Sequence, residues 1–125
     1  MAIQESGEMY LETILILSEK LKLVRSLDVA QEMNFSKPSV SRAIGILKNE
    51  GYVQVDEQGG LNLTTEGKKI AQKIYERHVV LTQMLVNLGV DEKTAAEDAC
   101  KIEHHISDKT FKALKKHLQA PKKNN

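Results

Sequence analysis

The 125 residues suffice for one compact domain, or for a small domain with an added helical layer, and leave little room for a second independent core. Apolar residues make up 41% and charged residues 28%, no apolar run is long enough to cross a bilayer, and the first residues lack the order of a secretion signal, so we expect a cytoplasmic protein without membrane contact. A net charge of +1 excludes an overall strongly basic nucleic-acid binder, although residues 20 to 77 carry ten Lys or Arg against seven acids.

The pattern of apolar and capping residues in the N-terminal part of the chain predicts two helices in succession. Apolar residues recur at helical spacing over about residues 6 to 21, with Ser6 as an N-cap. Ser26 is expected to cap a short second helix, and Asn34 suits the left-handed backbone conformation that ends it.

A third helix follows after a tight turn. Ser36 with Pro38 behind it is typical of a helix start, because serine caps a free N–H group and proline has none to leave unpaired. Gly51 is placed to end this helix. Two short helices joined by such a turn predict a helix-turn-helix unit, whose second helix enters the major groove of DNA.

After Gly51 the pattern changes. Alternating apolar residues at 52–55 and 61–63 flank a Gly-Gly turn and predict a hairpin, the wing of a winged helix. Thr64 or Thr65 then caps a long helix to Leu88, and two further helices are expected at 91–106 and 108–118. We therefore predict a mainly α protein with three parts: a winged helix-turn-helix DNA-binding domain (1–65), a helical domain (66–119) and a disordered tail (120–125).

The exposed face of the third helix carries short polar and cationic side chains, as a DNA-reading helix requires. Arg42 can donate two hydrogen bonds to guanine, and Lys37 and Lys48 can neutralise phosphates. The same pattern would also suit the solvated face of a protein-interaction module, but the complete order of helix, turn, helix and wing favours DNA. The candidate DNA-binding residues are Ser36, Lys37, Pro38, Ser39, Ser41, Arg42 and Lys48.

A candidate metal site lies near the C-terminus. Cys100, Glu103 and His104 share one face of a predicted helix, so thiolate, carboxylate and imidazole can converge on one ion. Taken alone, the trio is no better evidence for a metal than for a buried cysteine beside a surface pair. Cys100 is the only cysteine, which excludes an internal disulfide.

Two segments, residues 7–12 and 99–108, resemble the diphtheria-toxin-repressor family, which includes iron and manganese regulators. The resemblance runs from about Glu8 to Leu118 and corresponds to a short form without the family's SH3-like domain. It implies an iron-type ligand set of Met9, Cys100, Glu103 and His104, and a manganese-type set of Glu12, His78, Glu103 and His104. The candidate ligands are therefore Met9, Glu12, His78, Cys100, Glu103 and His104. A complete second site is not expected, because Thr82 and Ala96 stand where the iron type has further ligands.

The resemblance implies that residues 66–119 form a metal-binding and dimerisation domain. It also implies a divalent-metal-activated repressor, not an enzyme, that binds operator DNA as a homodimer when loaded with Fe(II) or Mn(II) and controls metal-homeostasis genes. Fe(II) is favoured because thioether and thiolate are softer ligands than carboxylates. The apolar residues Leu85, Val86, Phe111 and Leu114 could supply the dimer contact.

Three other functions remain open from the sequence. The nearest is a metal-independent winged-helix regulator that senses a small ligand or the oxidation of Cys100. A metalloenzyme with Glu103 as general base is disfavoured, because the sequence has no phosphate-binding loop or nucleophile elbow. The third is a winged helix that binds only proteins.

Overall fold

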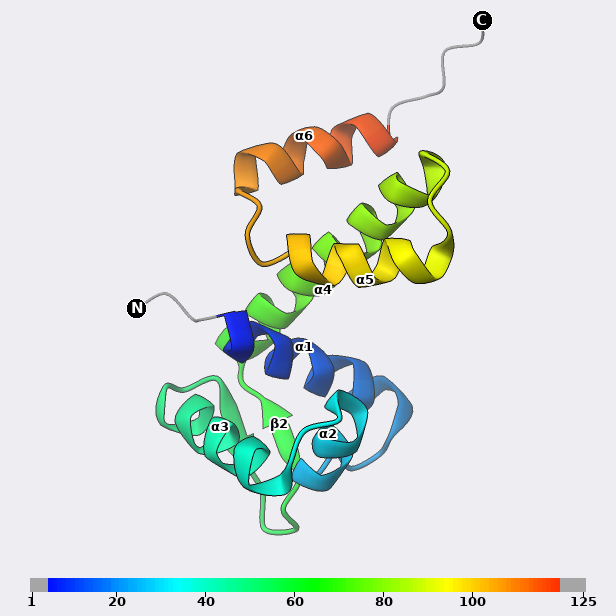
Figure 1. Ribbon diagram of the computed structural model, residues 1–125. Coiled ribbons are helices and arrows are strands. Elements are labelled where there is room, and N and C mark those ends of the chain that lie inside the picture. Colours follow the sequence, from blue (N-terminus) through cyan, green and yellow to red (C-terminus); the bar gives the residue numbers. More distant parts are fainter. Residues whose placement is uncertain (1–4, 120–125) are drawn as a thin grey trace, which may run out of the picture. The chain divides into compact units, whose positions relative to one another are not determined.

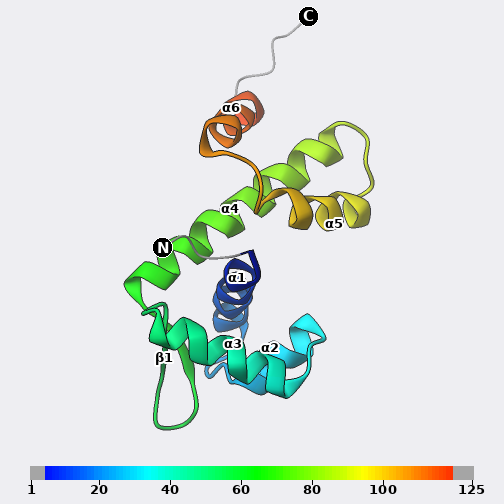
Figure 2. The same ribbon diagram turned by 60° about the vertical axis from the view of Figure 1, so that its left-hand side comes forward.

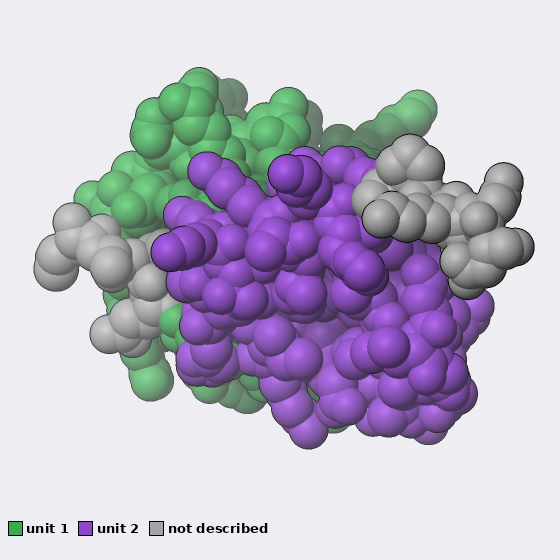
Figure 3. Space-filling view, turned by 90° about the horizontal axis from the view of Figure 1, so that it is seen from above, with its two compact units in different colours: residues 1–73 green, residues 74–125 purple. Residues whose placement is uncertain are grey.

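The computed structural model describes residues 5–119, so the predicted tail at 120–125 lies outside the described residues. The chain forms two compact units: the first ends at Lys73 and the second begins at Ile74. Figure 3 colours the first unit green and the second purple. No helix among residues 5–119 is long and apolar enough to cross a membrane.

The mainly α fold expected from the sequence is confirmed, with one two-stranded sheet among helices (Figure 1). Within residues 5–119, three helices precede the sheet and three follow it. In chain order the elements are α1 (Glu5–Lys20), α2 (Ser26–Met33), α3 (Lys37–Asn49), β1 (Val53–Val55), β2 (Leu61–Leu63), α4 (Thr65–Asn87), α5 (Glu92–Ile102) and α6 (Asp108–Gln119).

The first unit is a helix-turn-helix with a wing. Helix α1 packs on α2, α3 and β2, and α3 packs on β1, so that one apolar core lies among them. The centre of this core is fully buried and includes Leu11, Ile14, Val29, Val40 and Val53. The tip of the β1–β2 hairpin projects away from the three helices in both ribbon views (Figures 1 and 2).

The turn between α2 and α3 has the expected residues in the expected conformations. Asn34 adopts the left-handed conformation at φ 58°, and the Ser36 hydroxyl accepts a hydrogen bond from the Ser39 backbone N–H at 3.3 Å. The expectation that Ser26 caps α2 is wrong. The N-cap is Arg25, whose backbone N–H donates to the Asp28 carboxylate at 2.9 Å. The Asp28 side chain, and not the Ser26 hydroxyl, therefore stabilises the start of α2.

The wing is held by Asp56, a residue that the sequence placed only within a turn. Its Oδ1 accepts hydrogen bonds from the backbone N–H groups of Gln58 at 2.9 Å and Gly60 at 2.8 Å. These bonds lower the pKa of Asp56, the bond from Gly60 most. At the base of the wing, Thr64 caps α4 by accepting from the Gly67 N–H at 3.1 Å, and its hydroxyl donates to the Gly51 carbonyl at 2.7 Å.

In the second unit, α5 ends earlier than its apolar pattern predicted, at Ile102 rather than Ile106. Residues 103–105 form turns in which the His105 and Ile106 N–H groups both donate to the Ile102 carbonyl. The physical reason lies on α4. The Arg77 side chain donates hydrogen bonds to the carbonyl oxygens of Glu103 and Ile106, so these oxygens do not accept the backbone bonds of a continuing helix. The turn therefore carries two of the predicted ligands, Glu103 and His104.

Candidate metal centre

Three of the predicted ligands converge within the second unit. His78 lies on α4, Cys100 on α5, and Glu103 is the residue that caps α5. His78 Nδ1 is 2.9 Å from Glu103 Oε2 and 3.9 Å from Cys100 Sγ. One ligand atom from each of the three residues lies within 4.8 Å of the other two. The cluster joins two helices and the turn that follows the second.

Glu103 is the most unusual residue of this cluster, because its side chain is an acid with no solvent exposure. One carboxylate oxygen contacts His78, and the other, Oε1, has no hydrogen-bond partner among residues 5–119. His104 Nε2 lies 3.4 Å from Oε1, close enough for electrostatic attraction but not arranged as a hydrogen bond. A buried carboxylate oxygen without a donor favours a cation beside it.

The electrostatics of the cluster act most strongly on His78. Hydrogen bonding to Cys100, followed by hydrogen bonding to Glu103, outweighs partial burial and raises the pKa of His78 to about 10. At neutral pH the imidazole is therefore protonated and lies against the carboxylate. Because a metal ligand must be the neutral imidazole, an ion would have to displace this proton, and its affinity should fall as the pH is lowered.

The three residues fit a divalent transition metal. Ligand atoms bound to one ion through bonds of about 2.0–2.3 Å are at most about 4.6 Å apart. Both separations from His78 Nδ1 fall inside that limit, and all three ligand atoms lie within 4.8 Å of one another, so side-chain rotations that move them by a few tenths of an ångström bring them to one ion. A thiolate, an imidazole and a carboxylate together suit iron, cobalt, nickel or zinc. Cys100 is exposed and His78 is partly exposed, so an ion could enter from solvent.

The remaining predicted ligands come from the turn after α5 and from α1. His104 follows Glu103 on the turn, and its side chain is almost completely buried. Met9 and Glu12 lie on α1 in the first unit, where Met9 is half-buried and Glu12 is buried at 8% exposure. The burial of Glu12 is a property that its helical position did not reveal. His105, which was not expected to be a ligand, is exposed.

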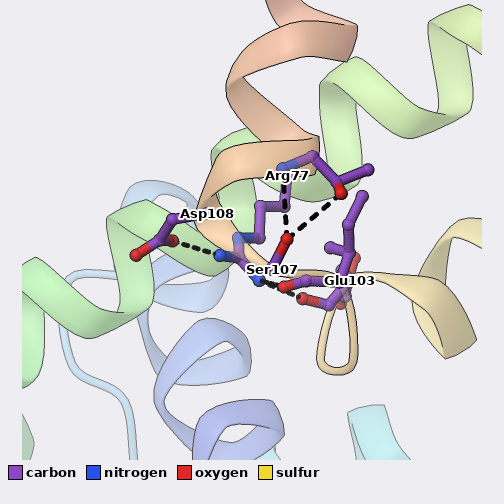
Figure 4. Close-up of polar contacts among 6 residues, drawn as sticks. Arg77, Glu103, Ser107 and Asp108 are labelled. Carbon is purple, nitrogen blue, oxygen red and sulfur yellow. Dashed lines mark hydrogen bonds and ion pairs between the residues drawn. The ribbon is translucent and has the colours of Figure 1, made fainter.

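Sequence reasoning missed Arg77, the residue before His78. Its guanidinium is buried and donates from Nη1 to the carbonyl oxygens of Glu103 at 3.0 Å and Ile106 at 2.7 Å, and from Nη2 to the Asp108 carboxylate (Figure 4). It also lies over the Phe111 ring, 5.5 Å from the centroid. A signal was present, because a cation three residues after the buried Ile74 interrupts the apolar stripe of the long helix.

The predicted DNA-reading residues form one exposed surface of the first unit. They lie at the start and along the outer face of α3, and all seven side chains are exposed: Ser36, Lys37, Pro38, Ser39, Ser41, Arg42 and Lys48. Val40, Ile44 and Leu47 occupy the opposite, buried face of the helix. The helix is therefore fixed by its apolar side, and its polar side faces solvent.

Comparison with protein families gives two adjacent matches that together span nearly the whole chain. Residues 2–61 match the iron dependent repressor N-terminal DNA binding domain. Residues 64–125 match the iron dependent repressor metal binding and dimerisation domain.

Individual relatives agree with these matches. The chain is 36% identical over 115 residues to an uncharacterised HTH-type transcriptional regulator of Methanocaldococcus jannaschii, covering 90% of this chain and 92% of that one. It is 34% identical to the transcriptional regulator MntR of Escherichia coli, covering 85% of this chain and 68% of MntR. Among solved structures, the manganese regulator SloR superposes with a TM-score of 0.82 at 32% identity over 98% of this chain, which spans only 56% of the length of SloR.

Proposed function

Because this chain belongs to the family of iron-dependent repressors, we propose that it is a divalent-metal-activated transcriptional repressor that binds operator DNA as a homodimer and controls metal-homeostasis genes. The family and its named relatives are transcriptional regulators, not enzymes. The observation that carries the metal part of the proposal is the convergence of His78, Cys100 and Glu103 within 4.8 Å of one another.

The proposed ligands are these three residues together with His104, Met9 and Glu12. Within the second unit, Glu103 supplies the buried negative charge, His78 gives up its proton, and Cys100 supplies the sulfur. Ligands from α1 would couple loading of the site to the DNA-binding unit. Metal and DNA would then strengthen each other's binding by the same factor, typically worth about 1–3 kcal/mol.

We propose Fe(II) as the activating ion, with Mn(II) as the alternative. The solved relatives named as manganese regulators give no support to iron, so this choice depends on the ligands of this chain alone. Cys100 offers a thiolate and Met9 a thioether, which are softer donors than carboxylates and favour iron over manganese. Affinity increases from manganese to iron at most such sites, so the test must compare activation as well as binding.

The DNA part of the proposal rests on the exposed face of α3. We propose that α3 enters the major groove, that Arg42 contacts a base edge, and that Lys37 and Lys48 contact phosphates. The Ser36 hydroxyl donates a hydrogen bond to the Ser39 hydroxyl at 2.9 Å, so the Ser39 proton is left to donate to a phosphate oxygen.

The test is DNA binding by the chelator-treated protein to the promoter of its own gene, measured anaerobically with and without Fe(II) or Mn(II). We expect the wild-type protein to bind DNA tightly only when metal is added. In His78→Ala, added metal should no longer strengthen DNA binding. His117→Ala serves as the matched control, because His117 is an exposed histidine in the last turn of α6. A Cys100→Glu variant should move activation towards Mn(II), and an unchanged iron-to-manganese ratio would contradict the choice of ion.

A second candidate function is a metal-independent regulator that responds to oxidation of Cys100. It is favoured by one observation: Cys100 is exposed, and its sulfur lies 3.9 Å from His78 Nδ1, so an oxidant can reach the thiol from solvent and a change there would reach His78. In this case DNA binding would persist after chelation and would change on treatment with peroxide. Retention of full DNA binding in the presence of chelator would replace the first proposal with this one.

A further inference from the structure

We infer that Arg77 is the positioning residue of the metal centre: it fixes the turn after α5 and thereby holds Glu103 and His104 in place for the ion before the ion binds. The inference rests on the proposed function, because it concerns the same centre. It goes beyond the ligands themselves to a residue that contacts no metal.

Arg77 binds the backbone from which Glu103 and His104 project. Nη1 donates to the Glu103 carbonyl at 3.0 Å and to the Ile106 carbonyl at 2.7 Å, and Nη2 contacts Asp108 at the start of α6 (Figure 4). These three acceptors lie at the beginning, near the end and just after the turn at 103–107. A single side chain therefore fixes the turn at both of its ends.

One turn of α4 carries both a proposed ligand, His78, and the residue that binds the turn after α5, Arg77. Arg77 and His78 are adjacent, so the distance from the His78 imidazole to the Glu103 backbone is set by two neighbouring side chains on one rigid helix. Glu103 Oε2 lies 2.9 Å from His78 Nδ1, so the side chains of both residues meet where Arg77 holds the backbone of one of them. Ligands already held in place avoid the ordering cost that an ion would otherwise have to offset.

An arginine suits this position better than a lysine because of the shape of its side chain. Only the planar guanidinium offers several donors in a fixed fork, here used for two carbonyls and a carboxylate, while its flat face lies over Phe111. The side chain is 6% exposed, so water cannot replace these bonds. A lysine at this position would keep the charge and lose the geometry.

A nearby ion pair allows the effect of Arg77 on the ligands to be distinguished from a general effect on the stability of the second unit. Glu76 Oε2 and Lys115 Nζ lie 2.7 Å apart and also join α4 to α6, one residue before Arg77. This pair is partly exposed, and its hydrogen bond joins Glu76 to Lys115 and not to the turn at 103–107. Glu76→Gln is therefore the matched control for Arg77→Lys.

The experiment measures Co(II) binding anaerobically, by competition with a chelator and by the visible spectrum, in the wild-type protein, Arg77→Lys and Glu76→Gln. Outer residues that orient ligands typically change metal affinity by about 10–100-fold, so Arg77→Lys should weaken Co(II) binding at least tenfold and alter the spectrum. Glu76→Gln should leave the affinity within about twofold and the spectrum unchanged. In the metal-free protein, Arg77→Lys should also speed hydrogen exchange of the His105 and Ile106 amides.

Unchanged Co(II) affinity and spectrum in folded Arg77→Lys would overturn the inference and leave the proposed function intact. If wild-type protein fails to bind Co(II), the proposed function is refuted and the inference with it. Should Arg77→Lys not fold, Asp108→Asn decides, because it weakens one exposed contact of the same guanidinium. A loss of affinity larger than that of Glu76→Gln supports the inference, and an equal or smaller loss overturns it.

Discussion

Replacing Gly67 by alanine should destabilise the first unit, although alanine is the better helix former. Gly67 is buried in the first turn of α4, where its N–H donates to the Thr64 hydroxyl at 3.1 Å. A Cβ atom at this position would lie 2.1 Å from the backbone oxygen of Tyr52. This oxygen accepts the hydrogen bond from the Thr64 N–H, so the clash falls on the base of the wing.

The magnitude follows from the distance. Ordinary contact begins at 3.4 Å, so the Tyr52 backbone or α4 must shift by about 1.3 Å. Overpacking of this kind costs about 1–3 kcal/mol and a weakened Thr64–Tyr52 hydrogen bond about 1 kcal/mol, while helix propensity returns about 1 kcal/mol. The expected net loss in the free energy of unfolding is therefore about 1–3 kcal/mol.

Gly45→Ala is the control with the opposite expected sign. Gly45 lies inside α3, and a Cβ atom there would meet nothing within 4 Å. Alanine should therefore stabilise the protein by about 0.5–1 kcal/mol. Urea unfolding followed by far-UV circular dichroism measures both variants, because the chain has no tryptophan. A Gly67→Ala protein as stable as the wild type would refute the reasoning.

Three further predictions follow from individual contacts. The lowered pKa of Asp56 means that its hydrogen bonds stabilise the wing above its ordinary value of 3.8 and are lost as the pH falls through the lower folded value. The stability difference between wild type and Asp56→Asn should therefore be constant near neutral pH and shrink below about pH 4, as urea titrations at several pH values would show. Glu103→Gln should weaken Mn(II) binding at least tenfold, about 1.4 kcal/mol, in a chelator competition assay, because it removes the buried charge; equal affinity would exclude Glu103 as a ligand. Lys48→Ala should reduce the salt dependence of DNA binding by about one unit of slope, whereas Arg42→Ala should also relax base preference, and identical behaviour of the two variants would contradict their separate roles.

The helix-turn-helix and its wing could be predicted from the sequence because their signals are local. Ser36, Pro38 and Asn34 act within one turn of their own positions, and the hairpin turn is set by neighbouring residues, so no distant contact was needed to place them. The Ser26 cap was misassigned for a related reason: two polar residues in one turn can compete for the same role, and Asp28 provided the bond.

For the candidate metal site, the sequence predicted the ligands, and the tertiary structure decided how they are held. Spacing alone brought Cys100 and Glu103 to one face, and the family resemblance added His78, because ligand type and order are properties of the sequence. The early end of α5, the complete burial of Glu103 and the role of Arg77 depend on side chains from α4 that reach residues about 25 to 31 positions away. Contacts of that separation leave no periodic trace in either segment, so only the folded chain decides them.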